Sequence, residues 1–148
     1  MSDYQSNGND IPNAGVTISL SDEAKIHLQS FTGYDGAPFK EMMDAFRFAV
    51  SLALAQCQDN VPNFESQSGT TLYNLGSFDS NQIFKEAIQV IAPKAYATTS
   101  LTRLIRFYGE KGIELMLENC GGDPSSFALE DALEEIHSTT SVEAQGGL

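Results

Sequence analysis

The sequence has little of what most enzymes use for catalysis. Its 148 residues include two histidines, two cysteines and eight lysines and arginines, against twenty aspartates and glutamates. General-base chemistry and zinc binding usually draw on clusters of histidine, whereas His27 and His137 fall on different predicted helices. No Cys-x-x-Cys pair, His-Glu-x-x-His motif or glycine loop ending in Lys-Ser/Thr is present. We therefore expect no enzymatic activity, no cofactor and no metal.

One set of residues, Asp59, Glu65, Lys85 and Glu86, has the acid and lysine composition of a nuclease site. Nucleases of that kind place these groups on adjacent strands, whereas Lys85 falls on a predicted helix. We therefore do not assign the set to catalysis.

Long apolar runs are also lacking. The charge-free run from Phe48 to Cys57 is half the length of the roughly 20 apolar residues that a bilayer-spanning helix needs. Residues 1–14 are polar, without a basic region or an apolar core, so a secretory signal is not expected. These features predict a cytoplasmic protein, without membrane contact, in which Cys57 and Cys120 are reduced.

Positive charge is scarce, and the formal net charge is −12. One short segment departs from this balance, with Lys94, Arg103, Arg106 and Lys111 against Glu110 alone. Arg103 and Arg106 lie three residues apart on a predicted helix and could grip phosphates as a nucleic-acid-binding patch. In the alternative, Arg106 pairs with Glu110 at i+4, while Arg103 and Lys111 remain at the outer face. A third possibility is that the acidic last helix covers this patch.

Apolar periodicity and capping residues predict a single, mainly α domain over residues 15–137, with four to five helices and one short N-terminal strand. The helices are expected near 22–31, 38–57, 81–92, 101–120 and 126–137. Residues 58–78 are expected to be a loop with a weak edge strand at Leu72 to Leu75. The polar segments 1–14 and 138–148 are expected to be disordered tails.

The predicted strand alternates Val16, Ile18 and Leu20 with Thr17 and Ser19. A lone strand needs a partner for its backbone groups. If the chain holds no second strand, the same strand of another copy becomes the partner, and the strand is paired across a dimer.

The helix expected at 38–57 loses its polar side after Arg47, where apolar Phe48, Leu52, Leu54 and Ala55 fill positions that should face water. A helix apolar nearly all round must be covered on every side. It is either the central helix of the fold or a subunit interface. The interface predicted from these patterns consists of Phe48, Leu52, Leu54 and Ala55 with Val16 and Ile18.

Two glycines, Gly109 and Gly112, fall inside the predicted helix at 101–120. Each costs roughly 1 kcal/mol relative to alanine. Either another helix approaches closely at this place, or the helix breaks at Gly109.

The order of strand, helix, turn and helix from Val16 to Leu54 resembles a ribbon-helix-helix unit. In that family two copies pair their strands into a ribbon that enters the DNA major groove. The outward strand positions here, Thr17 and Ser19, offer no Arg, Lys, Asn or Gln to read bases, and the turn is longer than the family usually has. The resemblance implies an intertwined dimer more than it implies DNA reading.

Three helical segments are similar to a pattern in small uncharacterised proteins encoded beside bacterial DNA phosphorothioation (Dnd) systems. The matching positions are Phe39, Asp44, Phe46, Phe48 and Ala49, then Ile91 and Ala92, then Tyr108, Gly109, Gly112 and Ile113. Met116 stands where the pattern has leucine. This resemblance implies an accessory role in DNA modification or phage defence and brings no catalytic residues with it.

These features predict a non-enzymatic interaction or assembly module, homo-oligomeric and associated with DNA modification or defence through the resemblance above. The alternative is a DNA-binding accessory or regulatory protein of ribbon-helix-helix type that uses Lys94, Arg103, Arg106 and Lys111.

Overall fold

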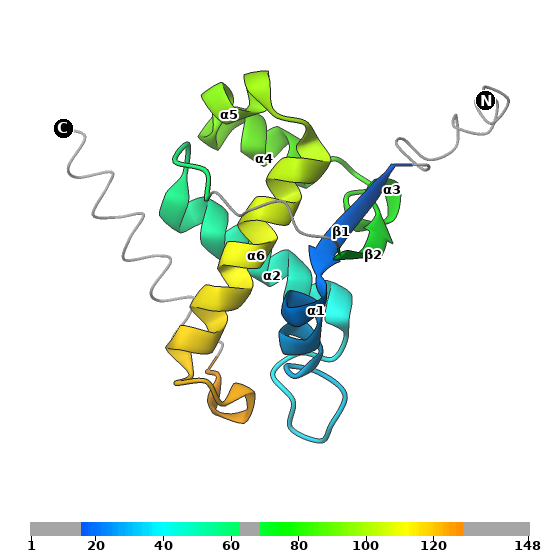
Figure 1. Cartoon of the computed structure of the whole chain (residues 1–148), viewed down its shortest axis with the longest axis vertical. Coiled ribbons are helices and arrows are strands. Elements are labelled where there is room, and N and C mark those ends of the chain that lie inside the picture. The colour runs from blue at the N-terminus through cyan, green and yellow to red at the C-terminus, as the bar shows by residue number, and fades with distance from the viewer. Residues whose placement is uncertain (1–15, 63–68, 129–148) are drawn as a thin grey trace, which may run out of the picture.

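The computed structural model describes residues 16–62 and 69–128 (Figure 1). In chain order the elements are β1 (Thr17–Ser21), α1 (Asp22–Gln29), α2 (Met42–Cys57), β2 (Gly69–Asn74), α3 (Leu75–Phe78), α4 (Ile83–Ile91), α5 (Pro93–Thr98), α6 (Leu101–Asn119) and a 3₁₀ turn (Pro124–Ser126). The prediction of a mainly α fold with a short N-terminal strand is confirmed. The predicted tails and most of the helix expected at 126–137 lie outside the described residues.

The crossing of α6 over α2 organises the fold (Figure 1). Gly112 lies so close to α2 that an added Cβ would come within 1.8 Å of the Ala49 carbonyl oxygen. A Cβ on Gly109 would lie 2.5 Å from the Phe46 ring. Because α6 is continuous from Leu101 to Asn119, a break at Gly109 is excluded. The close approach of another helix explains both glycines.

α2 is the helix that the rest of the chain covers. Its buried residues are Ala45, Phe46, Ala49, Val50, Leu52, Ala53 and Leu54. Half-buried Phe48 packs against the rings of Phe39 and Phe127, at centroid distances of 5.6 and 5.9 Å. The central-helix alternative therefore accounts for the apolar sides of α2. Leu52 and Leu54, predicted as interface residues, are 2% and 4% exposed, because a single chain already hides them.

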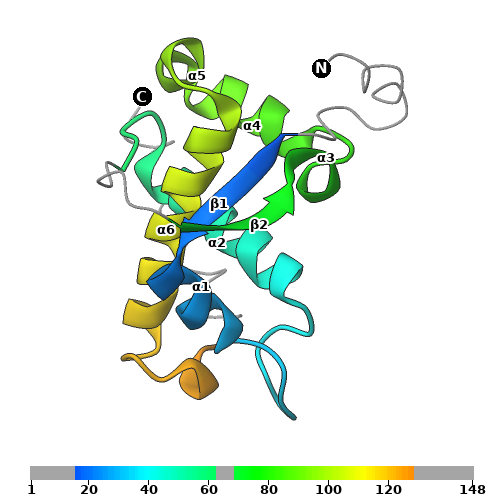
Figure 2. The ribbon, with the colours of Figure 1, turned by 45° about the vertical axis from the view of Figure 1, so that its right-hand side comes forward.

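β1 finds its partner within the chain and pairs antiparallel with β2 (Figure 2). The register shifts between Ile18 and Ser19, which leaves Leu72 as an extra residue that forms a bulge in β2. β2 lies within the segment expected to be mostly loop, where only a weak edge strand was predicted. Its sequence is polar and rich in threonine and gives little apolar alternation, so the hydrophobic pattern predicted only a weak strand here.

This pairing corrects the expected role of the strand. Ile18, predicted as an interface residue, is fully buried inside the chain. Val16 is 43% exposed, and its carbonyl oxygen accepts a hydrogen bond from the Leu75 N–H. Pairing of β1 across a dimer is therefore not needed to satisfy its backbone.

Two helices begin at serine caps, and the first turn of a third is bound by an aspartate that lies four residues before it. Ser21 Oγ and Ser100 Oγ each accept a hydrogen bond from a backbone N–H in the first turn of α1 and α6. The buried Asp79 carboxylate accepts from the N–H groups of Phe84 at 2.8 Å and Lys85 at 2.9 Å, which fixes the start of α4. Such caps contribute about 1 kcal/mol each.

Within the described ranges, none of the helices combines the length and the apolar character that crossing a membrane requires.

The α2–α6 crossing predicts an unusual response to a glycine-to-alanine change. At an open helix position this change should raise the free energy of unfolding by roughly 1 kcal/mol. Gly112→Ala should instead lower it by about 3 kcal/mol, because the new methyl group meets the α2 backbone and the helices must separate. Urea unfolding measures both quantities.

Gly109→Ala is the matched control, since its methyl group meets a side-chain ring that can shift rather than backbone. It should destabilise the protein less than Gly112→Ala. A Gly112→Ala protein more stable than the wild type would show that the two helices do not approach in this way.

Candidate functional site

The most exposed apolar surface of the described residues lies on α4. Ile83, Val90 and Ile91 are 58%, 78% and 37% exposed, and half-buried Ala87 lies between them. The four residues have the spacing i, i+4, i+7 and i+8, so they share one side of the helix. We call this surface the α4 face.

The adjoining side of α4 is anchored in the core. Ile88 is fully buried, and the Phe84 ring lies 4.7 Å from the ring of Phe78. α4 therefore has one broad apolar side, which is packed at the margin of Phe84 and Ile88 and open at the margin of Ile83 and Val90. The spacing of the apolar residues predicts such a side but does not show how much of it the core covers.

α4 and α5 stand together at the end of the molecule where α6 begins (Figure 2). Asp79 fixes the start of α4, as described above. Asp59 fixes the start of α5, because its carboxylate accepts hydrogen bonds from the N–H groups of Lys94 at 3.1 Å and Ala95 at 3.0 Å. The α4 face is thus presented by a helix that is held in place at its start and along its packed side.

The charge around the α4 face differs from that of the whole chain. Between Ser80 and Thr102 the sequence has Lys85 and Lys94 against Glu86 alone, a local charge of +1. The net charge of the protein is −12. Asp79 and Asp59 also lie here, at the starts of α4 and α5, so two cations face three carboxylates and the region is weakly acidic, with a local charge of −1.

The predicted nucleic-acid patch is only partly available. Arg106 Nε lies 3.6 Å from the Glu110 carboxylate, so the predicted i+4 pair is present. Lys111 Nζ pairs with Glu114 at 2.8 Å, and this hydrogen bond raises the pKa of Lys111. Two of the four cations thus have an acidic partner on their own helix.

The other two cations of the patch are exposed. Lys94 lies on α5, and the Arg103 guanidinium lies 5.3 Å from the centre of the Phe107 ring. DNA binding by this patch stays a prediction, with fewer available charges than the sequence suggested.

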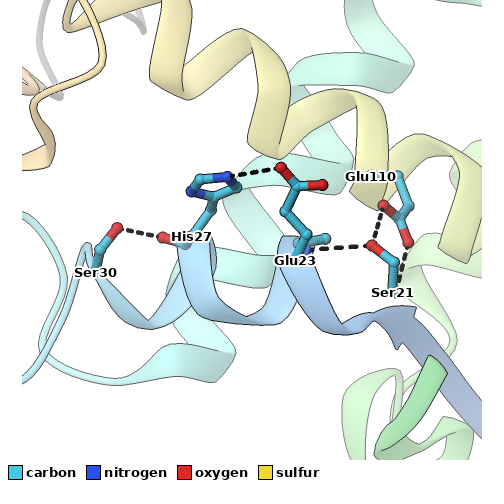
Figure 3. Close-up of polar contacts among 6 residues, drawn as sticks. Ser21, Glu23, His27, Ser30 and Glu110 are labelled. Carbon is cyan, nitrogen blue, oxygen red and sulfur yellow. Dashed lines mark hydrogen bonds and ion pairs between the residues drawn. The ribbon is translucent and has the colours of Figure 1, made fainter.

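Glu110 has a structural role that the sequence did not reveal. Its carboxylate is only 10% exposed and accepts hydrogen bonds from Ser21 N–H at 2.8 Å and Ser21 Oγ–H at 3.0 Å (Figure 3). Because Ser21 also caps α1, Glu110 ties α6 to the junction of β1 and α1. Arg106 therefore pairs with a carboxylate that already supports the fold.

His27 and Asp59 also serve local structure. His27 Nε2 lies 3.6 Å from Glu23 on the surface of α1 (Figure 3). Asp59 caps α5, so the nuclease-like set lacks an available acid at that position. In residues 16–62 and 69–128, no group of three histidine, cysteine, aspartate or glutamate side chains could hold a metal ion.

An open depression of about 450 Å³ lies at the loop between α1 and α2. Its lining comes from residues 33–40 and includes the titratable side chains Tyr34, Asp35 and Lys40. These groups supply no nucleophile paired with a base, and the depression suggests no chemistry.

Tyr108 is the titratable group that the fold alters most clearly. Its ring is fully buried, and its hydroxyl donates a hydrogen bond to the Gln58 carbonyl oxygen at the end of α2. Burial raises the pKa of Tyr108 to about 12, with smaller contributions from Cys57 and Asp59. Gln58 has a φ of 50°, so this contact holds a residue in a backbone conformation that side chains rarely adopt.

Alkaline pH should therefore destabilise the protein. The unfolded chain releases the Tyr108 proton near the ordinary tyrosine pKa of about 10, whereas the folded chain retains it to about 12. The stability that this group contributes is fully present below pH 10 and is lost as the pH rises through the folded pKa. Urea unfolding at a series of pH values measures the decline.

Tyr108→Phe should flatten this decline. A smaller slope should remain, because burial also raises the pKa of Tyr73. Tyr34→Phe, at a position that is 44% exposed, serves as the control and should leave the slope unchanged. An unchanged slope in Tyr108→Phe would contradict the assignment.

A scan against protein-family models, a search of curated proteins and a search of solved structures find no match to this chain. Its function is therefore inferred from its own residues and contacts.

Proposed function

We propose that the protein is a non-enzymatic interaction or assembly module that docks through the α4 face. The observation that carries this proposal is the 78% exposure of Val90, with Ile83 at 58%, on a helix whose adjoining residues Phe84 and Ile88 are packed into the core. Single exposed apolar residues are normal in monomers, but several on one helical stripe form a continuous patch that a partner can cover.

The free energy available at the α4 face is comparable with the cost of association. Fully burying a valine or isoleucine side chain contributes about 1.5–3 kcal/mol. Three such side chains, already partly covered, offer roughly half of their combined value. Association itself costs several kcal/mol in lost translational and rotational freedom. The α4 face alone therefore supports a weak, reversible complex.

The engagement of the polar side chains supports the same proposal. Asp59, Asp79 and Glu110 each accept two hydrogen bonds that fix helix ends and junctions. These three carboxylates therefore serve the fold. The α4 face, by contrast, is left open by the fold and is available to a partner.

We keep the predicted homo-oligomer within this proposal, but we place its interface on α4 instead of α2. The Dnd resemblance adds the proposal that the module serves a DNA-modification or defence system in the cytoplasm. Of the positions that carry this resemblance, Phe46, Gly109 and Gly112 meet at the α2–α6 crossing. Those positions describe how the helices pack rather than a binding site.

A photo-reactive amino acid at position 90 tests the proposal in cells that naturally carry the protein. Illumination should produce adducts of discrete protein mass, because a docked partner lies against this residue. The same label at exposed Glu114 on α6 is the control and should give few adducts. Equal or absent adducts at the two positions would contradict docking through the α4 face.

A further inference from the structure

We propose that α4 and α5 form one hinged unit, which pivots at Gln82 and is fastened to the end of α2 by the turn from Cys57 to Asn60. We call this turn the latch and the two helices the α4–α5 unit. The unit opens and closes as one body, while α2 and α6 stay packed on each other. This inference concerns a motion of the fold and does not depend on which partner the α4 face binds.

The latch is a tight turn that holds one residue in an unfavourable conformation. The Cys57 carbonyl oxygen accepts a hydrogen bond from the Asn60 N–H at 2.9 Å, which closes the turn. Gln58 has a φ of 50° and a ψ of −126°, as the first central residue of a type II′ turn does. Glycine is preferred at this position because it has no Cβ, so a glutamine there stores backbone strain.

Two contacts hold the latch closed against this strain. The Tyr108 hydroxyl donates a hydrogen bond to the Gln58 carbonyl oxygen. The next residue, Asp59, binds the first N–H groups of α5 through its carboxylate. The strained conformation is thus fixed from α6 and from α5 together. When α5 leaves Asp59, one of the two restraints is lost and Gln58 can relax, so the strain favours opening.

The pivot lies at the other end of the unit. Among the described residues, Gln58 and Gln82 are the two non-glycine positions with positive φ, and Gln82, at 61°, directly precedes α4. The buried Asp79 carboxylate reaches across this position to the N–H groups of Phe84 and Lys85. Hinges are usually a few residues at the ends of elements that absorb a change in the backbone. Both unusual backbone positions therefore fall where the α4–α5 unit joins the rest of the fold.

The α4–α5 unit is lightly anchored compared with the two central helices. α4 fully buries Ile88 and packs the half-buried Phe84 ring on Phe78, and α5 buries Ala95. α2 and α6 each bury seven residues. Regions with few buried apolar contacts open locally at a lower free energy than the core. The unit can therefore leave its place before the α2–α6 crossing is disturbed.

Opening would change the apolar surface that α4 offers. In the closed form the core covers the margin of Phe84 and Ile88, while Ile83 and Val90 remain open. In the open form both margins of this apolar side become available. A partner that covers the whole side would bind the open form more tightly and shift the population toward it. The latch thus regulates how much of α4 a partner can reach.

Hydrogen–deuterium exchange of the purified full chain, read by mass spectrometry, tests the hinge. Helices of nine and six residues are too short to persist alone, so undocking should expose their N–H groups to exchange. Amides of α4 and α5 should exchange together, at least about tenfold faster than those in the middle of α2. Exchange of the unit only together with α2 and α6 would overturn the proposal.

Gln58→Gly tests the latch by removing the strain from its closed form. It should slow exchange in α4 and α5 about fivefold, because the closed form is stabilised relative to the open one. Gln56→Gly is the matched control, since it makes the same change two residues earlier, inside α2 and without a positive φ. It should not slow exchange in the unit. An unchanged rate in Gln58→Gly would show that the turn takes no part in opening.

Asp59→Asn tests whether the two helices move as one. A neutral amide oxygen accepts hydrogen bonds less strongly than a carboxylate, so exchange should speed up about threefold. The increase should be equal in α4 and α5, although the bonds of Asp59 go to α5. A response confined to α5 would contradict a single hinged unit. None of these results bears on cross-linking at position 90, which tests docking through the α4 face separately.

Discussion

The contact between Gly112 of α6 and the backbone of α2 at Ala49 is the constraint on which the rest of the structure depends. Without a side chain at Gly112, the two helices approach until little space separates their backbones. That approach brings Phe46 against Gly109 and places Tyr108 beneath the end of α2. A core built this way gains contact area that offsets the helix propensity lost at the two glycines.

Polar groups hold the smaller elements onto this pair of helices. Asp59 and Asp79 bind the first turns of α5 and α4, and Glu110 binds the junction of β1 with α1. On the other side, the Arg47 side chain donates to the Ser77 and Phe78 carbonyl oxygens at the end of α3. No buried side-chain nitrogen or oxygen in the described part of the chain lacks a partner. The charged residues therefore explain the architecture more directly than they explain any chemistry.

The sequence predicts most of this fold, and its errors have identifiable causes. The caps at Ser21 and Ser100 follow from local rules that burial does not alter. For Gly109 and Gly112 the sequence left a close helix approach and a helix break open, and the structure decided for the close approach. Helical periodicity shows that α4 has a broad apolar side, but it does not show how much of that side the core covers, so the exposure of Val90 required the structure. For α2, the apolar pattern fitted either a central helix or a subunit interface, and the burial of Leu52 and Leu54 within one chain favoured the central helix. Glu110 was visible only as a partner of Arg106, because its contact with Ser21 joins residues 89 positions apart.

The bulge at Leu72 has a consequence for how the molecule avoids aggregation. β2 is a sheet-edge strand whose sequence, GTTLYN, contains neither a charge nor a proline. Such a strand would ordinarily template the growth of intermolecular sheet, as in amyloid. The extra residue interrupts the regular ladder and increases the local twist, so an incoming strand finds no flat edge to extend. A single inserted residue thus protects this edge, and no charged side chain on the strand is needed.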